Sequence, residues 1–135
     1  MLQLGAGWAA AAIFLLIVDA IWLGVVARDF YFSRIGGLMR EDIWLGVASL
    51  FYIFYSLCVV LLVSMPAARG EGLTQALIFG AVLGLCAYGT YDITNLATIK
   101  GWPVSVVVVD MAWGAFITAA TAGVGVLAMG WMKAG

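Results

Sequence analysis

The sequence predicts an all-α membrane protein, an antiparallel bundle of four transmembrane helices. Two features of its composition support this. The 135 residues are 66% hydrophobic and only 10% charged, whereas a soluble domain carries about 25% charged residues. The apolar residues also occur in long runs without period-two alternation, which indicates helices rather than strands in the bilayer.

Four spans are expected, each longer than the roughly 20 residues that a 30 Å hydrocarbon layer requires. They cover about residues 8–27, 44–64, 74–98 and 104–132, within a single domain of residues 1–135. Pro66 and Gly70–Gly72 predict the turn after the second span. Gly101-Trp102-Pro103 predicts the next turn, with the proline where it suits the start of a helix.

The ends of the first span need separate interpretation. It lacks a basic n-region and contains Asp19 and Trp22, so we expect a retained span rather than a cleaved signal peptide. The connection that follows, Arg28–Ile43, mixes aromatic residues with arginines. This mixture predicts a segment in the headgroup layer, broken at Gly36-Gly37.

Three aspartates, Asp19, Asp92 and Asp110, lie inside the expected spans. A carboxylate at the centre of a membrane helix costs roughly 2.5–3.5 kcal/mol on insertion scales. These side chains should therefore meet one another or other polar groups rather than lipid. An alternative is that they only hold the bundle together, but interhelical hydrogen bonds contribute about 0.6 kcal/mol on average, which offsets little of that cost.

The aspartates are expected at one depth. Each lies seven to nine residues from a residue that marks the same membrane face, or roughly 10–13 Å along a helix. Tyr52 reaches this level from the second span. The first and fourth spans share the pattern Asp-x-x-Trp, which places each tryptophan on the face of its acid. The candidate ligand-binding or proton-carrying residues are Asp19, Asp92, Asp110, Asn95, Trp22, Trp113, Tyr52 and Tyr88.

The chemistry of this layer has three alternatives, because the spans contain no Lys, Arg or His around the acids. The acids could be protonated, solvated by nearby polar side chains, or bound to a cation. A hard divalent ion would use Asp19, Asp92 and Asp110 as candidate ligands, whereas an organic ammonium would also use the aromatic faces. Without a bound cation we expect at least one acid to keep its proton, with Asp92 the first candidate.

Other chemistries are disfavoured. Cys58 and Cys86 are isolated and the chain has no His, which removes the usual ligands of zinc, haem and iron–sulfur clusters. There is no nucleotide-binding motif, no basic cluster for nucleic acid, and no base near a serine for triad hydrolysis. An enzyme is therefore the less favoured class.

Small residues predict close helix packing. Gly80-x-x-x-Gly84 on the third span and Ala115, Ala119 and Gly123 on the fourth allow backbones to approach. We interpret them as contacts within the monomer rather than as a dedicated dimer seam.

The order of motifs resembles a known family. D-x-I-W-L-G, R-x-F-Y, G-x-L-M, T-Y-D-x-T-N-L-A-T, W-P and V-D-x-x-W-G follow one another from about Asp19 to Gly114. This order is similar to that of DUF2177, a family of small bacterial membrane proteins. The resemblance implies a four-helix inner-membrane protein and implies no reaction, substrate or catalytic residue.

The leading functional hypothesis is binding or translocation of a cation, or of a small cationic or proton-coupled solute. The chain is transporter-like in outline, although it lacks the first-span Glu of small multidrug transporters. One alternative is a lipid-modifying enzyme or accessory factor; another is a structural subunit docking on a larger membrane complex. Expected partners are the lipid bilayer and a small cation or lipid, with a homodimer as a further hypothesis.

Basic residues predict the orientation in a bacterial inner membrane. Arg28, Arg34, Arg40 and Lys100 flank one face, whereas Arg69 and Lys133 flank the other. Positive residues collect in the cytoplasm, so both termini are expected in the periplasm.

Reporter fusions test this topology. A reporter active only in the periplasm should work when fused after Gly135 and fail when inserted at Gly36-Gly37, because the arginine-rich connection is retained in the cytoplasm. A cytoplasm-only reporter at the same two sites is the control and should give the reverse pattern. The opposite result at both sites would invert the assignment.

Overall fold

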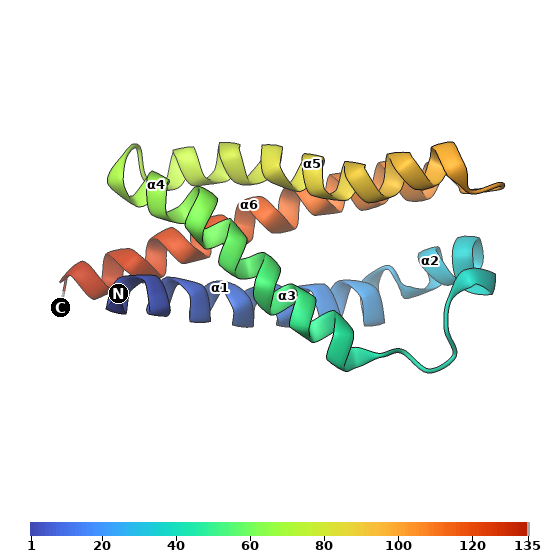
Figure 1. Cartoon of the computed structure of the whole chain (residues 1–135), viewed down its shortest axis with the longest axis horizontal. Coiled ribbons are helices and arrows are strands. Elements are labelled where there is room, and N and C mark those ends of the chain that lie inside the picture. Colours follow the sequence, from blue (N-terminus) through green and yellow to red (C-terminus); the bar gives the residue numbers. More distant parts are fainter. Residues whose placement is uncertain (135) are drawn as a thin grey trace.

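The computed structural model describes residues 1–134 and confirms the predicted all-α bundle. Four helices are long and apolar enough to cross a membrane, and successive helices run in opposite directions (Figure 1). In chain order these are α1 with its extension η1 (Leu2–Ile21, Trp22–Val26), α3 with η3 and α4 (Leu45–Val59, Val60–Ser64, Met65–Arg69), α5 (Leu73–Thr98) and α6 (Val104–Ala134).

Two span boundaries differ from the sequence expectation. The first helix begins at Leu2 rather than near Trp8, and the second continues to Arg69 rather than ending near Ser64. Pro66 was expected in a turn but lies at the start of α4. The π-helical turn η3 immediately precedes α4 and shifts the backbone hydrogen-bond register, so a proline without an N–H begins a new helical turn.

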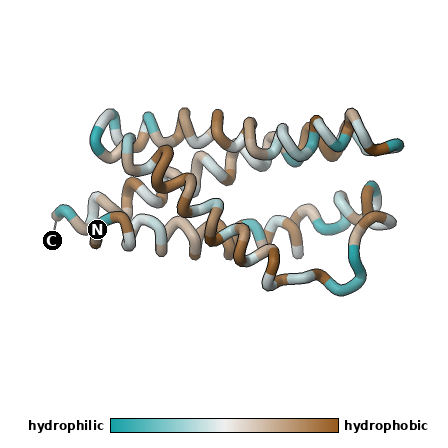
Figure 2. Tube along the Cα trace, viewed as in Figure 1, coloured by the Kyte–Doolittle hydropathy of each residue, from teal (hydrophilic) through white to brown (hydrophobic). Residues whose placement is uncertain are grey.

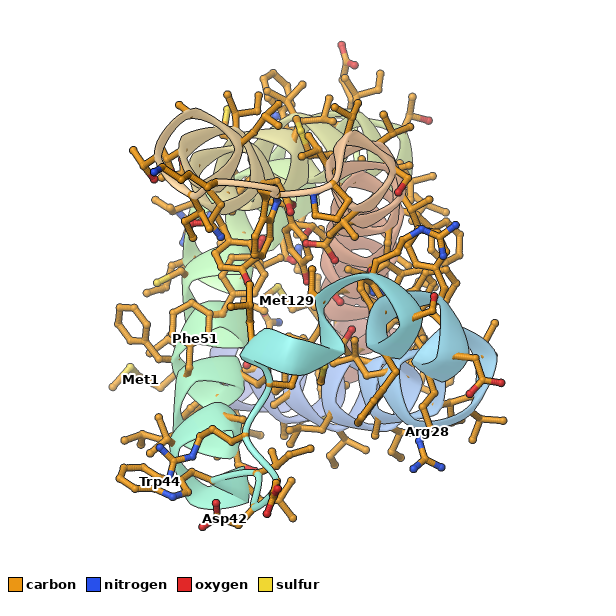
Figure 3. All side chains as sticks on the ribbon, turned by 90° about the vertical axis from the view of Figure 1, so that its right-hand side faces the viewer. Met1, Arg28, Asp42, Trp44, Phe51 and Met129 are labelled. Atoms are coloured by element: carbon orange, nitrogen blue, oxygen red, sulfur yellow. The ribbon has the colours of Figure 1, made fainter. Side chains whose placement is uncertain are left out.

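The connection between the first two spans folds back onto the bundle. It forms the short helix α2 (Arg28–Ile35), the 3₁₀ turn η2 (Gly36–Leu38) and an irregular stretch up to Trp44. Tyr31 is 7% exposed and packs with Trp102 and Val106 near the start of α6. Viewed along the bundle, this connection crosses in front of the ends of the long helices (Figure 3).

The half of the bundle that contains the two termini is closely packed. A Cβ atom added to Gly80 would lie 2.7 Å from the Cα of Ala119, and one added to Gly84 would overlap the backbone of Gly114. The predicted role of these glycines in packing within the monomer is therefore confirmed for the α5–α6 pair. Ser64 adds a hydrogen bond of 2.9 Å from its hydroxyl to the Ala122 carbonyl.

The other half of the bundle is more open. The N-terminal end of α3 diverges from α5 (Figure 1) and packs mainly on α1. The α5 helix meets the second span chiefly at η3 and α4. Hydrophilic segments are concentrated at the ends of the bundle, in the α4–α5 turn and in the connection before α3 (Figure 2). The open half is therefore the half from which α2 and the arginine-rich connection extend.

Gly84→Ala tests the close packing. The added methyl group would meet the Gly114 backbone, so we expect a loss of about 1–3 kcal/mol in the free energy of unfolding. Unfolding in detergent, followed by circular dichroism, measures it. Gly5→Ala is the matched control, because nothing lies within 4 Å of its Cβ position. It should leave stability unchanged or raise it slightly, since alanine favours helix. Equal effects at the two positions would contradict the packing argument.

Candidate functional site

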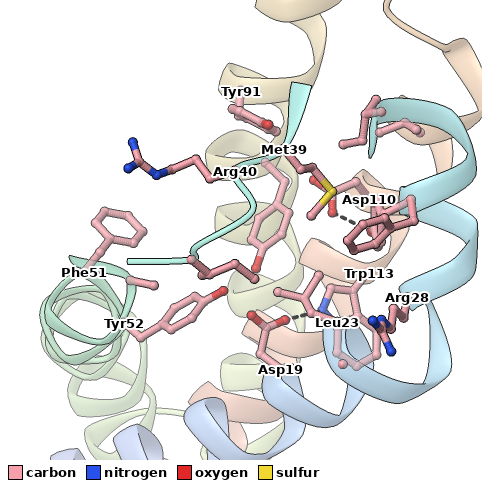
Figure 4. Close-up of a pocket in the computed structure, with 18 of the residues that line it drawn as sticks. Asp19, Leu23, Arg28, Met39, Arg40, Phe51, Tyr52, Tyr91, Asp110 and Trp113 are labelled. Carbon is pink, nitrogen blue, oxygen red and sulfur yellow. Dashed lines mark hydrogen bonds between the residues drawn. The ribbon is translucent and has the colours of Figure 1, made fainter. Parts of the chain in front are cut away.

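A cavity of about 1180 Å³ occupies the open half of the bundle. It exceeds the roughly 300–1,000 Å³ of typical ligand pockets and, like them, has mainly apolar and aromatic walls. Every long helix contributes, together with α2 and the connection before α3 (Figure 4). Among its lining residues are the carboxylates of Asp19 and Asp110.

Asp19 lies in the last turn of α1 and is 2% exposed. The indole Nε1 of Trp113, on α6, donates a hydrogen bond of 2.9 Å to its Oδ1. Tyr52, on α3, directs its hydroxyl toward the same carboxylate (Figure 4). Three helices therefore converge on this acid.

Asp110 on α6 is held by a residue from the connection. The Tyr31 hydroxyl donates a hydrogen bond of 2.8 Å to its Oδ1 and accepts one of 3.3 Å from Trp22 Nε1. Burial raises the pKa of Tyr31 above its ordinary value, and the neighbouring Asp110 raises it further. The hydroxyl therefore keeps its proton and remains a donor to the carboxylate.

The two Asp-x-x-Trp segments meet in space. Trp22 and Trp113 stack with ring centroids 4.1 Å apart and planes 4° from parallel. Trp113 donates to the acid of the other motif, Asp19, whereas Trp22 reaches Asp110 through Tyr31. The π-helical turn η1 starts at Trp22, so the helix is locally wider where the stack forms.

Asp92 on α5 has a different environment. It is completely buried, and neither of its carboxyl oxygens has a hydrogen-bond donor among the described residues. Its carboxyl group lies within hydrogen-bonding reach of Asp110, but two ionised carboxylates have no proton to share. The pair therefore needs a proton, a water or a cation between them.

The structure divides the predicted site residues into two sets. Asp19, Asp110, Trp113, Tyr52 and Tyr88 line the cavity. The others, Asp92, Asn95 and Trp22, lie outside its lining. Thr94, two residues after Asp92, donates its hydroxyl to the carbonyl oxygens of Thr90 and Tyr91 on its own helix. Across residues 1–134 no three acidic, Cys or His side chains group as a metal site.

Sequence reasoning missed the contribution of the connection. Tyr31 anchors Asp110, and Met39 and Arg40 line the cavity beside it. Tyr55 and Tyr91 complete the aromatic wall. The feature that could have predicted this contribution is the apolar and aromatic content of Arg28–Ile43, which is higher than a solvated loop requires.

These features define a multi-pass α-helical membrane protein with an acidic, aromatic cavity inside its bundle. The chain belongs to the DUF2177 family of predicted membrane proteins, whose family model matches residues 5–127. The resemblance seen in the sequence is thereby confirmed. No curated protein and no solved structure matches the chain.

Tyr31→Phe tests the anchoring of Asp110. It removes the hydroxyl that donates to the carboxylate and accepts from Trp22, so we expect a loss of about 1.5–3 kcal/mol in the free energy of unfolding. Unfolding in detergent measures it. Ser33→Ala on the same helix is the control, because its exposed hydroxyl donates only to the nearby Phe30 carbonyl and accepts from the exposed Arg34 side chain; its effect should stay within about 0.5 kcal/mol. Similar values for both variants would argue against the anchor.

Proposed function

We propose that this protein binds an organic cation in the cavity, with the ammonium group at Asp19 and Asp110. The observation that carries the proposal is a mainly apolar, aromatic cavity with the carboxylates of Asp19 and Asp110 in its lining. Arg28 and Arg40 also line the cavity, but both come from the connection, and among the described residues neither forms an ion pair with these two acids. Carboxylates attract an ammonium by charge, and the faces of Trp113 and Tyr88 add cation–π attraction.

The surroundings favour an organic cation over a divalent metal ion. Mg²⁺ and Ca²⁺ prefer six or more oxygen ligands from carboxylates, carbonyls and water. Asp19 and Asp110 are held by donors on different helices, and Asp92 does not line the cavity. Around the two carboxylates the walls are mainly aromatic and aliphatic, which suits an ammonium carrying apolar groups.

Asp92 has a supporting role in this proposal. It is buried beside Asp110 and lacks a donor, so we propose that the pair holds one proton when the cavity is empty. An asparagine at position 92 could donate its amide N–H to Asp110 in place of that proton. Asp92→Asn should therefore preserve ligand binding.

Binding is better supported than translocation by this conformation. Beyond the acids, the bundle is closed by the Gly80 and Gly84 contacts and by the packing of Val60 and Met129. We further propose that the cavity end faces the cytoplasm of a bacterial cell, because the arginine-rich connection lies there. A subunit that only docks on a larger complex needs an apolar outer face and no internal cavity, so the cavity favours ligand binding.

Ligand titration tests the function. Radiolabelled dodecyltrimethylammonium should bind the purified protein in nonionic detergent, and dodecyl sulfate at the same mole fraction should not displace it. Asp19→Asn and Asp110→Asn should each weaken binding by about tenfold or more, because each removes a charge that faces the ammonium.

The control is Asp29→Asn, an exposed acid at the start of α2 that does not line the cavity. It should leave affinity unchanged, as should Asp92→Asn. Binding that is insensitive to both Asp19→Asn and Asp110→Asn would overturn the proposal.

A further inference from the structure

We infer that the ligand is an alkylammonium amphiphile that reaches the cavity sideways from the bilayer, through an opening between α3 and α5. This inference rests on the proposed function and specifies the class of cation. The opening is flanked by Phe51 on α3 and Tyr91 on α5 (Figure 4). Both side chains line the cavity, yet they are 57% and 53% exposed.

Helix packing explains why the opening lies there. In the cavity half, α3 leans on α1, whereas α5 packs along α6 and meets the second span only farther along, at η3 and α4. The small residues Ala48 and Ala87 line the cavity from the two helices that border the gap. Their methyl side chains are too short to fill the space between α3 and α5, so that space stays open.

Other helices and the connection border the remaining sides of the cavity, where Leu23, Phe32 and Trp44 are 44%, 48% and 58% exposed. Close packing of α1 and α5 on α6 closes the opposite wall. The end toward the aqueous face is covered by α2 and the connection, with Ile35, Gly36 and Met39 in the lining. Tyr31, which belongs to α2, packs with Trp102 and so holds α2 on the bundle. The Arg40 guanidinium lies 4.2 Å from the Trp44 ring centroid, which attaches the connection to the start of α3.

The surface around the opening faces the lipid of the bilayer. Phe54, one turn from Phe51 on α3, is 59% exposed, and Tyr91 on α5 is 53% exposed; both lie within helices that are long and apolar enough to span the bilayer. Lipid chains therefore surround the opening. A solute that enters there must already be dissolved in the bilayer, which requires an apolar chain.

The cavity walls match the two parts of such a molecule. Aromatic and aliphatic side chains near the opening offer contact for an alkyl chain, whereas Asp19 and Asp110 offer the charge for its ammonium group. A cation without a chain would gain only the charged contact. The chain length of the ligand and the free passage between α3 and α5 are therefore the two properties to test.

Competition against radiolabelled dodecyltrimethylammonium tests the chain. Tetramethylammonium carries the same headgroup and remains in water, and it should fail to displace the probe even at concentrations about 100-fold higher. The contrary result is that tetramethylammonium displaces the probe with comparable affinity and loses this ability in Asp19→Asn. The proposed cation site would then stand, and the inference that the ligand is an amphiphile from the bilayer would be wrong. Loss of binding by both cations would instead overturn the proposed function.

Ala48→Trp tests the route, because an indole at this position would fill the passage. We expect probe affinity to fall by about tenfold or more. Val47→Trp is the matched control, because it adds the same group one residue away, where the side chain is 61% exposed and outside the lining. It should change nothing.

A second pair keeps the test decisive if Ala48→Trp does not fold. Ala87→Trp obstructs the same passage from α5, and Leu85→Trp is its control, 44% exposed and outside the lining. Unchanged affinity and unchanged binding rate in a folded Ala48→Trp or Ala87→Trp protein would show that the ligand takes another path.

Discussion

The need to satisfy carboxyl groups inside an apolar bundle is the constraint on which the rest of this structure depends. An apolar environment offers a carboxyl group no water to bind, so each acid requires a protein donor or a bound partner. Asp19 obtains its donor from Trp113, and Asp110 obtains its donor from Tyr31. These bonds join α1 and α2 to α6, and the Trp22–Trp113 stack lies between them. The acids therefore determine which helices must meet.

This constraint divides the bundle into two halves with different packing. In the half with the termini, glycines and alanines bring α5 and α6 into backbone contact. In the other half, large aromatic side chains and carboxylates lie among the small residues, and α3 diverges from α5. Bulky polar and aromatic groups do not interdigitate as small apolar ones do, so a cavity remains. The proposed ligand site is the consequence of that difference in side-chain size.

The candidate site was predictable in part. Depth in the membrane could be counted from the chain, and counting selected Asp19, Asp110 and Tyr52, which line the cavity. The sequence does not show which face of each helix points inward, because that depends on the helices packed against it. Asp92 and Asn95 have the right depth and lie outside the cavity lining. Tyr31 escaped notice because it lies in a connection, where sequence gives no register relative to the spans.

The two π-helical turns illustrate the same limit. Nothing in the residues Trp22–Val26 or Val60–Ser64 distinguishes them from ordinary helix. Each turn widens a long helix locally, one just after Asp19 and one just before Pro66. Local widening of this kind is favoured when it lets a helix fit its neighbours. It therefore becomes visible only when the neighbours are present.

By itself, the sequence determined that the chain is a four-helix membrane protein, that turns fall at Gly70–Gly72 and at Gly101, and that three acids lie within its long apolar helices. Hydrophobic length and residue chemistry are local properties, and they act before any helix meets another. Only the tertiary structure decided that Trp113 donates to Asp19, that Tyr31 donates to Asp110, and that a cavity remains in one half of the bundle. Those outcomes depend on helix rotation and on the packing of side chains far apart in sequence, which no local pattern specifies.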